Sequence, residues 1–361
     1  MKQIVILVFL FIGAKSFSQQ LSIQTLGFEK MKLNNCTEVK DQYLSATCWS
    51  FAGNSFLESE LLKNGKGNFN LSEMFIARHS MKRKIERHLA LKGKNFFTPG
   101  GQFHDEIWVM KHFGMMPESA YSGKLSATTH HNHGALDTAI SHFVKKMLAK
   151  GVTQLNATQN KFVDSVLDAN LGTIPKTFQY EGKIYTPQSF LQEVLSINPD
   201  DYVEITSYTH HPFYKKFVLE DKYNWTGDAY WNVPLADYSA ITDQALKNGF
   251  TVVWDGDADD PDFQFNKGLA YLRTGLAVSQ QDRQKAFEDE TTLLDHMMHI
   301  VGVTKDKFGN KWYYVKNSWG KYGNQIGGFI FMRNDYFLMR TVAIIVNKNA
   351  IPESIRKKMG I

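Results

Sequence analysis

Cys48 is the residue best placed by the sequence for nucleophilic chemistry. It begins a run in which apolar residues recur at helical spacing up to Lys63. The N–H groups and the dipole at a helix N-terminus favour an anion, so they lower the pKa of a thiol toward the reactive thiolate. Gln42 lies six residues earlier, on the loop leading into this helix. Its side-chain amide and the Cys48 backbone N–H could together stabilise an oxyanion.

Two later segments supply a base and a group that could orient it. His296 follows Asp295 at the start of an apolar, strand-like run. Asn317 ends another such run, two residues before Trp319. An Asn that accepts a hydrogen bond from the far imidazole nitrogen would fix the tautomer and direction of the ring. Trp319 over that contact would exclude water. Nucleophile, base and orienting amide are therefore present in that order.

These segments resemble the papain family of cysteine peptidases. The resemblance rests on Gln42 to Cys48-Trp49, on Asp295-His296 and on Asn317-Ser318-Trp319-Gly320. It implies a two-lobed α+β fold with the active-site cleft between a helical lobe and a sheet lobe. It also implies cleavage of peptide bonds in peptide or protein substrates through an acyl-enzyme, without a metal or organic cofactor. Gly100-Gly101 resembles the glycine pair whose backbone binds substrate in that family, and Trp319 is expected to border the same site.

Two departures from the family pattern point to one of its branches. Ser45-Ala46-Thr47 stands where the signature has Cys-Gly, so the partner for a signature disulfide is missing. Cys48 and His296 lie about 250 residues apart, roughly 100 more than is usual in papain-like enzymes. Both features resemble the bleomycin hydrolase and aminopeptidase C branch. That branch implies trimming of amino termini and assembly into a homo-oligomer, a hexameric barrel. In that branch a C-terminal arm enters the cleft and binds the amino terminus of the substrate. The segment from Pro352 to Ile361 is short for such an arm, so an endopeptidase is the alternative expectation.

The order of the expected elements supports an α+β fold. Helical patterns cover residues 48–63, 73–90, 102–112, 134–149, 159–169 and 237–248, and a further one begins at Thr186-Pro187. Strand-like runs cover 250–255, 297–304, 311–316, 329–332 and 341–346. Helices before strands predict a helical lobe and a sheet lobe. We expect one peptidase domain over 19–361: a helical lobe over about 48–121, a mostly helical insertion over about 122–230 and a sheet lobe over about 250–348.

The first residues read as a leader that directs export to the periplasm or the outside of the cell. Lys2, an apolar core over 4–14 and small residues at 16–18 match a signal peptide over 1–18. The apolar run is short for a membrane span, so no stable membrane anchor is expected, although an uncleaved anchor is the alternative. Only two cysteines are present. On count alone they could form a bridge, whereas a catalytic Cys48 would leave Cys36 as a buried apolar residue.

Composition and the remaining clusters exclude several classes of protein. Hydrophobic residues make up 43% and charged residues 21%, which is typical of a globular protein. The net charge of +5 is spread along the chain, so nucleic acid is not expected as a partner. No metal site is expected. The histidines at 130, 131 and 133 fit no zinc spacing and, like His210-His211, are expected in solvated loops. The acidic run from Asp255 to Asp260 has its glycine in the wrong place for a calcium loop.

Two other functions remain compatible with these residues. A Cys-His enzyme could pass its acyl group to an amine instead of water, as an acyl or amide transferase does. A papain-like fold could also bind peptides without cleaving them. The complete set of Cys48, His296, Asn317 and Gln42 favours the peptidase over this inactive binding protein.

Overall fold

The structure is a computed structural model that describes residues 21–126, 129–275 and 277–361. Among these residues, none of the helices combines the length and the apolar character needed to cross a membrane. The expected leader over 1–18 lies outside the described residues.

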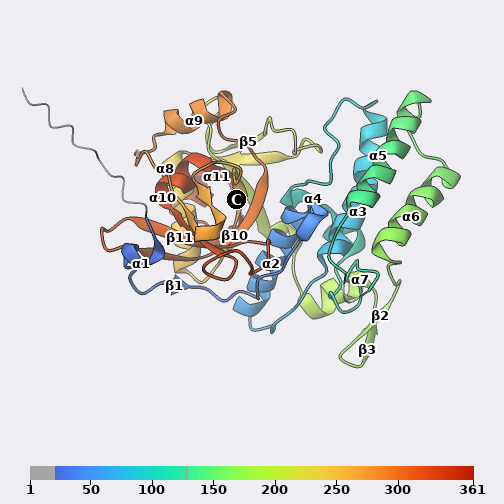
Figure 1. Cartoon of the computed structure of the whole chain (residues 1–361), viewed down its shortest axis with the longest axis horizontal. Coiled ribbons are helices and arrows are strands. Elements are labelled where there is room, and N and C mark those ends of the chain that lie inside the picture. Colours follow the sequence, from blue (N-terminus) through green and yellow to red (C-terminus); the bar gives the residue numbers. More distant parts are fainter. Residues whose placement is uncertain (1–20, 127–128, 276) are drawn as a thin grey trace, which may run out of the picture.

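Five helices form the helical lobe (Figure 1). They are α2 (Cys48–Lys63), α3 (Glu73–Ala90), α4 (Phe103–Phe113), α5 (Gly134–Ala149) and α6 (Ala157–Leu171). Each begins and ends within two residues of the range expected from its periodicity. Ser72 caps α3, because its hydroxyl accepts the backbone N–H of Phe75 at 3.1 Å.

The central helix is α2, which lies between α3 and α4 on one side and strand β10 on the other (Figure 1). Every residue from Trp49 to Leu61 is buried. Because all faces of α2 are covered, it needs no amphipathic stripe. This burial also explains why polar residues such as Glu58 and Asn54 point into the protein and require partners there.

A mixed sheet forms the second lobe. Within the described residues its strand order is β5-β6-β4-β13-β7-β10-β11-β12-β9-β8, and β1 pairs with β10 outside this path. The strands are β1 (Lys32–Leu33), β4 (Tyr202–Thr206), β5 (Lys215–Val218), β6 (Ala229–Asn232), β7 (Val252–Gly256), β8 (Phe263–Gln264), β9 (Leu269–Ala270), β10 (His296–Lys305), β11 (Lys311–Lys316), β12 (Phe329–Arg333) and β13 (Thr341–Asn347). The helices of this lobe are α8 (Leu235–Lys247), α9 (Gln280–Glu288), α10 (Asn334–Arg340) and α11 (Glu353–Met359).

The central strands β7 and β10 contribute to two cores at once. Val253 and Met297 pack into the core of the helical lobe, whereas Trp254 and Met298 pack into the core beneath α8 and α10. This follows from the alternation of side chains along a strand. Since both faces are buried, these strands read as continuous apolar runs in the sequence.

The expected insertion over 122–230 contains the long helices α5 and α6. After α6 it forms the hairpin β2 (Phe178–Tyr180) and β3 (Lys183–Tyr185), three short helical segments, and the strands β4, β5 and β6 that extend the main sheet. The sequence did not indicate these strands. The strands β2 to β6 are short and carry several exposed polar residues, so their periodicity gave little signal.

Short elements connect the longer ones. They are α1 (Ile23–Leu26), η1 (Tyr43–Ser45), α7 (Pro187–Ser189), the π-helix η2 (Phe190–Leu195), η3 (Pro199–Asp201), η4 (Phe265–Lys267) and η5 (Lys348–Ala350). Thr186 caps α7 as its Thr-Pro sequence indicates, since its hydroxyl accepts the N–H of Ser189 at 3.1 Å.

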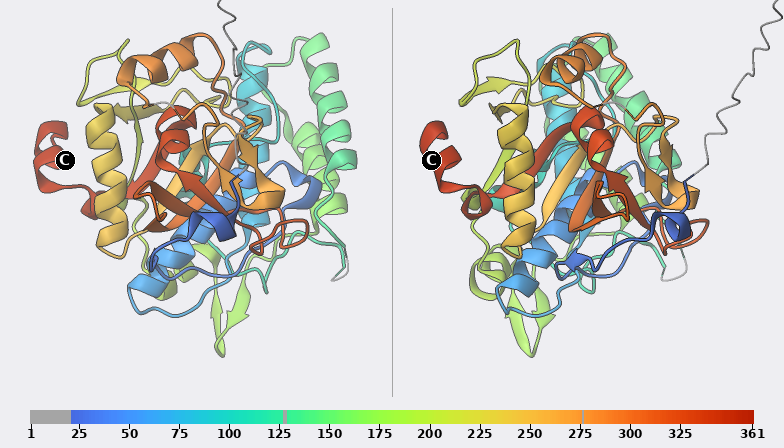
Figure 2. Two further views of the ribbon diagram at one scale, coloured as in Figure 1. Left: turned by 60° about the vertical axis from the view of Figure 1, so that its left-hand side comes forward. Right: turned by 90° about the vertical axis from the view of Figure 1, so that its left-hand side faces the viewer.

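The C-terminal helix α11 packs on the outer side of the sheet lobe. Figure 2 shows the C-terminus beside α8. Ile355 and Met359 are buried in the core that α8 shares with the sheet. Ile361 lines a surface cavity together with Trp231 and Lys111, away from Cys48.

Candidate active site

Cys48 and His296 come from different lobes and line one small cavity. Cys48 is the first residue of α2, and His296 is the first residue of β10. The cavity has a volume of about 230 Å³. It is lined by Cys48, Gly100, Gly101, Tyr223, Asp255, Leu294, Asp295, His296 and Met297. The helix N-terminus and the strand end therefore present a thiol and an imidazole to the same space.

The ring of His296 is held by Asn317, which follows β11. The His296 Nε2 lies 2.7 Å from the Asn317 Oδ1. The same oxygen accepts the backbone N–H of Ser318 at 2.7 Å, so the amide must present its oxygen to the ring. Nε2 therefore carries the proton, and Nδ1 is left as the basic nitrogen. The Trp319 ring packs against His296, with a centroid distance of 4.5 Å.

Gln42 is fixed to the segment that follows Asn317. Its backbone N–H donates to the Ser318 carbonyl at 2.8 Å, and its Oε1 accepts the Ser318 hydroxyl at 2.7 Å. This leaves the Nε2 amide as the donor end of a buried side chain. Between Gln42 and Cys48 the chain passes through Tyr43 and Ala46, which both adopt positive φ values of 47° and 53°. Positive φ values at residues other than glycine are strained, and such strain is often found at functional sites.

Burial dominates the protonation of both reacting groups. It raises the pKa of the Cys48 thiol to about 12, against the lowering effect of the Met297 and Trp49 backbones. Burial also lowers the pKa of His296 to about 4, although the Asn317 hydrogen bond opposes this. Both shifts favour the neutral thiol and the neutral imidazole. The thiol proton must then pass to His296 as the sulfur attacks.

The two glycines expected to bind substrate do line the cavity. A Cβ on Gly100 would lie 2.8 Å from Tyr223 Cε1, and one on Gly101 would lie 2.9 Å from Trp49 and from Asp105. Neither position has room for a side chain, so only glycine brings the backbone this close to the cavity. The Lys84 ammonium group donates hydrogen bonds to the carbonyls of Pro99 and Gly100 and so helps to hold this segment.

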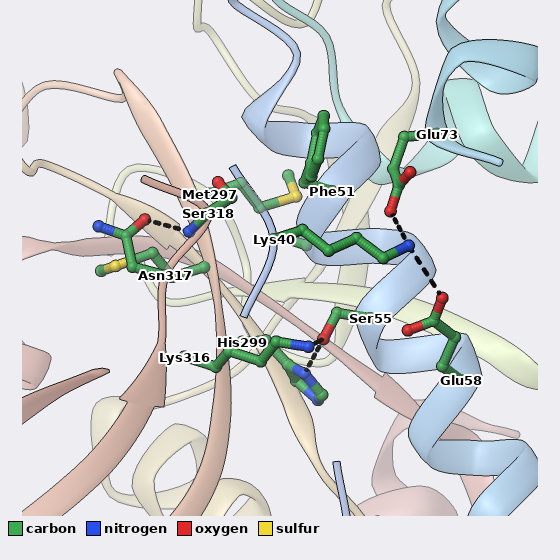
Figure 3. A pocket seen from close by; sticks show the side chains of 12 residues that line it. Lys40, Phe51, Ser55, Glu58, Glu73, Met297, His299, Lys316, Asn317 and Ser318 are labelled. Carbon is green, nitrogen blue, oxygen red and sulfur yellow. Dashed lines mark hydrogen bonds and ion pairs between the residues drawn. The ribbon is translucent and has the colours of Figure 1, made fainter. Parts of the chain in front are cut away.

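A buried polar network lies directly behind the site, between α2 and the strands β10 and β11 (Figure 3). Lys40 bridges Glu58 and Glu73. On the other side of the network Lys316 donates to the Ser55 hydroxyl at 2.8 Å, and this hydroxyl lies 2.8 Å from the His299 Nδ1. His299 is thus a buried member of this network. The network ties the lobes together one layer beneath Asn317.

Two of the three histidines near residue 130 are buried, whereas His130 is exposed. His131 and His133 are only 5% and 6% exposed, so the expectation of a solvated loop is wrong for both. The backbone N–H of His133 donates to the Leu44 carbonyl at 3.1 Å, and the His130 ring stacks on Tyr43. This segment therefore packs against the loop between Gln42 and Cys48. The spacing of the histidines gave no sign of it, because the contact is tertiary.

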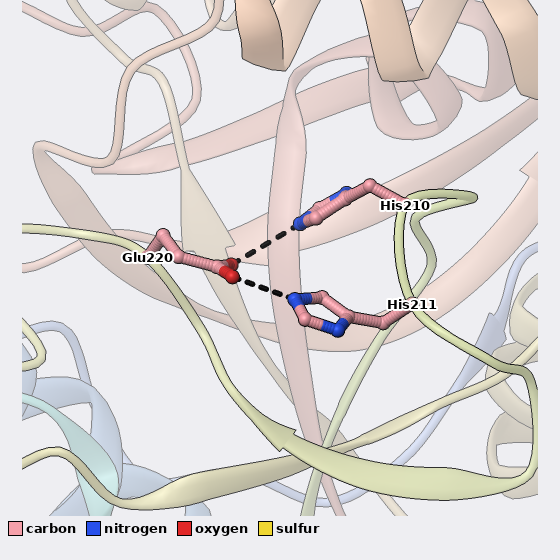
Figure 4. Close-up of side chains that lie close together, drawn as sticks. All are labelled: His210, His211 and Glu220. Carbon is pink, nitrogen blue, oxygen red and sulfur yellow. Dashed lines mark hydrogen bonds and ion pairs between the residues drawn. The ribbon is translucent and has the colours of Figure 1, made fainter.

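His210 and His211 form a paired cluster with Glu220 (Figure 4). Their Nε2 atoms lie 3.1 Å and 2.6 Å from the two Glu220 oxygens. Gln284 accepts the Thr209 N–H and so donates its amide to the His210 Nδ1 at 2.9 Å. The His210 Nε2 must then carry a proton, which a metal ligand cannot. The three side chains are arranged for hydrogen bonding, and their donor set does not fit a metal ion.

Two cavity residues were not recognised from the sequence as part of this site. Asp255 had been considered only as part of an acidic run, and Tyr223 had not been singled out. Both reach the cavity through the strand pairing of the sheet, which the sequence does not reveal. Both cysteines lie in the described part of the chain and are free thiols, so the bridge that their number allowed is not formed. Cys36 is only half-buried, less than expected.

Comparison with known proteins places this geometry in a family. The model of the Peptidase C1-like family matches residues 14–360. Aminopeptidase G of Lactobacillus delbrueckii subsp. lactis is 25% identical over 365 residues, which cover 86% of this chain and 80% of that protein. Aminopeptidase C of Lactobacillus helveticus is 24% identical, covering 88% and 81%. Bleomycin hydrolase of Gallus gallus is 23% identical, covering 71% and 64%.

A solved structure shares the fold. The crystal structure of PepW from Lactobacillus rhamnosis HN001 superposes with a TM-score of 0.68 at 17% identity, covering 93% of this chain and 86% of that chain. The protein is thus a papain-like α+β cysteine peptidase. The chain belongs to the Peptidase C1-like family, and its relatives assign it to the aminopeptidase C and bleomycin hydrolase branch.

Proposed function

We propose that Cys48, His296 and Asn317 form the catalytic triad and that Gln42 completes the oxyanion site. The observation that carries this proposal is the 2.7 Å contact between His296 and Asn317 at the edge of the cavity that also contains Cys48. An imidazole whose tautomer is fixed beside a thiol at a helix N-terminus is the arrangement that nucleophilic catalysis requires.

The reaction proceeds in two stages. The Cys48 Sγ attacks the peptide carbonyl while its proton moves to the His296 Nδ1, and a C–S bond forms. The Gln42 amide and the Cys48 N–H bind the oxyanion. His296 then gives its proton to the leaving nitrogen as the C–N bond breaks. In the second stage His296 takes a proton from water as the water oxygen attacks the thioester carbonyl. The C–S bond then breaks, the acid is released, and the Cys48 sulfur regains its proton from His296.

The proposal is tested with the Cys48→Ala and His296→Ala variants on fluorogenic peptide amides. Each should lose at least about 10³-fold in kcat/KM, whereas Cys36→Ser should keep wild-type activity. A thiol-reactive epoxide should label Cys48 in the wild type and in Cys36→Ser. Undiminished hydrolysis by Cys48→Ala would overturn the proposal. Release of amide products instead of acids, when an amine acceptor is added, would identify a transferase.

We further propose that the enzyme acts at amino termini, as the names of its bacterial relatives say of those proteins. The Tyr223 ring against Gly100 supports this proposal, because a substrate chain that extended along the glycine pair would meet this ring. Digestion of one peptide with a free and with a blocked amino terminus tests it. Equal cleavage of both forms would indicate an endopeptidase.

Export is proposed from the leader-like residues 1–18 alone. Expression of the full chain in a bacterial host with a secretion pathway, followed by N-terminal sequencing, tests it. A mature chain that begins near Gln19 in the exported fraction is expected. A chain retained with its first residues intact would contradict this proposal.

A further inference from the structure

A hairpin reaches from the sheet lobe across to the helical lobe at the Gly100 end of the cavity. Its strands are β5 and β6, and its tip, residues 219–228, contacts α3 and α4. The Trp225 Nε1 donates to the Asp105 Oδ2 at 2.9 Å. The Arg87 Nε donates to the Trp225 carbonyl at 3.0 Å. The tip of this hairpin of the sheet lobe is therefore anchored on the helical lobe.

The hairpin tip places Tyr223 against Gly100. The Tyr223 backbone N–H donates to the Asp221 Oδ1 at 2.7 Å, and its ring meets Phe96 edge to face at 5.3 Å. The position of a Cβ on Gly100 lies only 2.8 Å from this ring. Tyr223 thus closes the cavity at the glycine pair. A substrate chain that extended along the glycine pair would meet this ring.

Asp255 lines this cavity with a buried carboxyl group. It lies on β7 opposite Met297 of β10, the residue after His296. The side chain is 1% exposed, and its Oδ2 has no hydrogen-bond partner among the described residues. The neighbouring Asp295 differs, because its oxygens accept the backbone N–H groups of Ala258 and Asp259. Asp255 is therefore the acid that is left for a ligand.

The surroundings of Asp255 are negative. Burial is the first cause that raises its pKa well above the usual range, and the charges of Asp221, Glu204 and Asp295 raise it further. A nearby Gln102 amide opposes this. A buried, unpaired carboxyl group is costly to keep, and a cation bound beside it removes that cost. The ligand that fits is positively charged and donates hydrogen bonds.

We propose that the Asp255 carboxylate binds the ammonium group of the substrate residue that precedes the scissile bond, so that Asp255 selects cationic substrates. This inference rests on the proposed peptidase function. The ammonium group comes either from a free amino terminus or from a Lys side chain. The closure by Tyr223 favours the amino terminus, since a chain that continued beyond this residue would meet the ring.

The test uses two pairs of aminomethylcoumarin amides. The first pair, alanine and N-acetylalanine, differs in the free amino terminus; the second pair, N-acetyllysine and N-acetylnorleucine, differs in the side-chain ammonium group. The wild type should cleave free alanine at least about tenfold faster in kcat/KM than its acetylated form. Asp255→Asn should reduce this preference at least about tenfold. The matched control Asp259→Asn, which removes an exposed carboxylate from the segment that follows β7, should keep this preference. A wild-type preference for acetyllysine over acetylnorleucine that Asp255→Asn removes would identify the side chain as the ammonium source.

Several outcomes would overturn the inference. A folded Asp255→Asn variant that keeps the wild-type preference for free alanine contradicts the inference. A wild type that cleaves both members of each substrate pair equally well, while Cys48→Ala is inactive, contradicts it too. That second result leaves the proposed function intact. A wild type inert toward all four substrates overturns both. Calorimetry on Cys48→Ala does not depend on the folding of Asp255→Asn: alaninamide should bind and N-acetylalaninamide should not, and equal binding or none contradicts the proposal.

Discussion

The Oδ1 of Asn317 accepts two hydrogen bonds at once, from the His296 Nε2 and from the Ser318 backbone N–H, each at 2.7 Å. The backbone donor decides which end of the amide faces the ring. A buried ring whose Nε2 must donate presents its Nδ1 as the only basic nitrogen. The orientation of the base is therefore set by the backbone that follows β11, and it does not depend on substrate.

Replacement of Asn317 should affect the rate and its pH dependence. Asn317→Ala frees the ring, and kcat/KM should fall by about 10²-fold. In the wild type the active form has neutral His296, so kcat/KM should rise as the pH passes through the His296 pKa of about 4. Asn317→Asp places a negative charge beside the ring and raises that pKa, so the acid limb should move to higher pH. An acid limb that stays in place in Asn317→Asp would contradict the role of this contact.

Gln42 should matter for the transition state and little for substrate affinity. Gln42→Ala removes one oxyanion donor, so kcat should fall by about 10²- to 10³-fold with KM nearly unchanged. Ser318→Ala is the control, because it removes the 2.7 Å partner of the Gln42 Oε1 but keeps the donor amide. Its rate should stay within about tenfold of the wild type. Steady-state kinetics on a single peptide amide distinguish the two. A loss confined to KM in Gln42→Ala would argue against an oxyanion role.

The sequence predicted the helices and strands that are marked by a pattern of neighbouring residues. The bounds of α2 followed from the helical run after Cys48 and from the Gly65 that ends it. The central strands of the sheet were predicted because both of their faces are buried, which gives continuous apolar runs. The positions of Gly100 and Gly101 on the cavity wall also agree with the family resemblance.

The parts that the sequence did not predict depend on tertiary contacts. The strands β4 and β6 are short and half-exposed, and only their pairing with β13 and with each other defines them. The buried state of His131 comes from packing against Phe51, far away in the sequence. Asp255 looks like one acid in a polar turn until β7 is paired with β10. Residues that meet across adjacent strands are far apart in the sequence, so their spacing along the chain does not predict that they share a site.

The burial of His131 and His133 predicts a loss of stability in acid. Burial lowers their pKa values to about 3 and about 4. Between pH 4 and 6.5 the unfolded chain therefore binds more protons than the folded one, so the free energy of unfolding should fall as the pH falls through this range. His133→Gln removes one of these groups, and the loss between pH 7 and pH 4.5 should shrink by about 2 kcal/mol.

Urea unfolding at both pH values measures this difference. The exposed His130 provides a matched control, since His130→Gln should leave the pH dependence of unfolding unchanged. Because the segment from His130 to His133 packs on the Tyr43–Ser45 turn, this loss of stability also affects the loop that leads to Cys48. Equal pH dependence in the wild type and in His133→Gln would contradict this account.

Tyr223 should limit how many residues a substrate can place before the scissile bond. Its ring covers Gly100 at the closed end of the cavity, with the Gly100 Cβ position 2.8 Å away. Tyr223→Ala removes the ring and opens the backbone of the glycine pair to an extended chain. The kcat/KM for N-acetylated dipeptide amides should then rise at least about tenfold relative to free alanine amide. Tyr223→Phe keeps the ring and should retain the wild-type ratio. Because Asp255 is unchanged in both variants, affinity for alaninamide should persist in the Cys48→Ala background. A Tyr223→Ala enzyme that still rejects acetylated dipeptides would mean that another part of the chain closes the cavity.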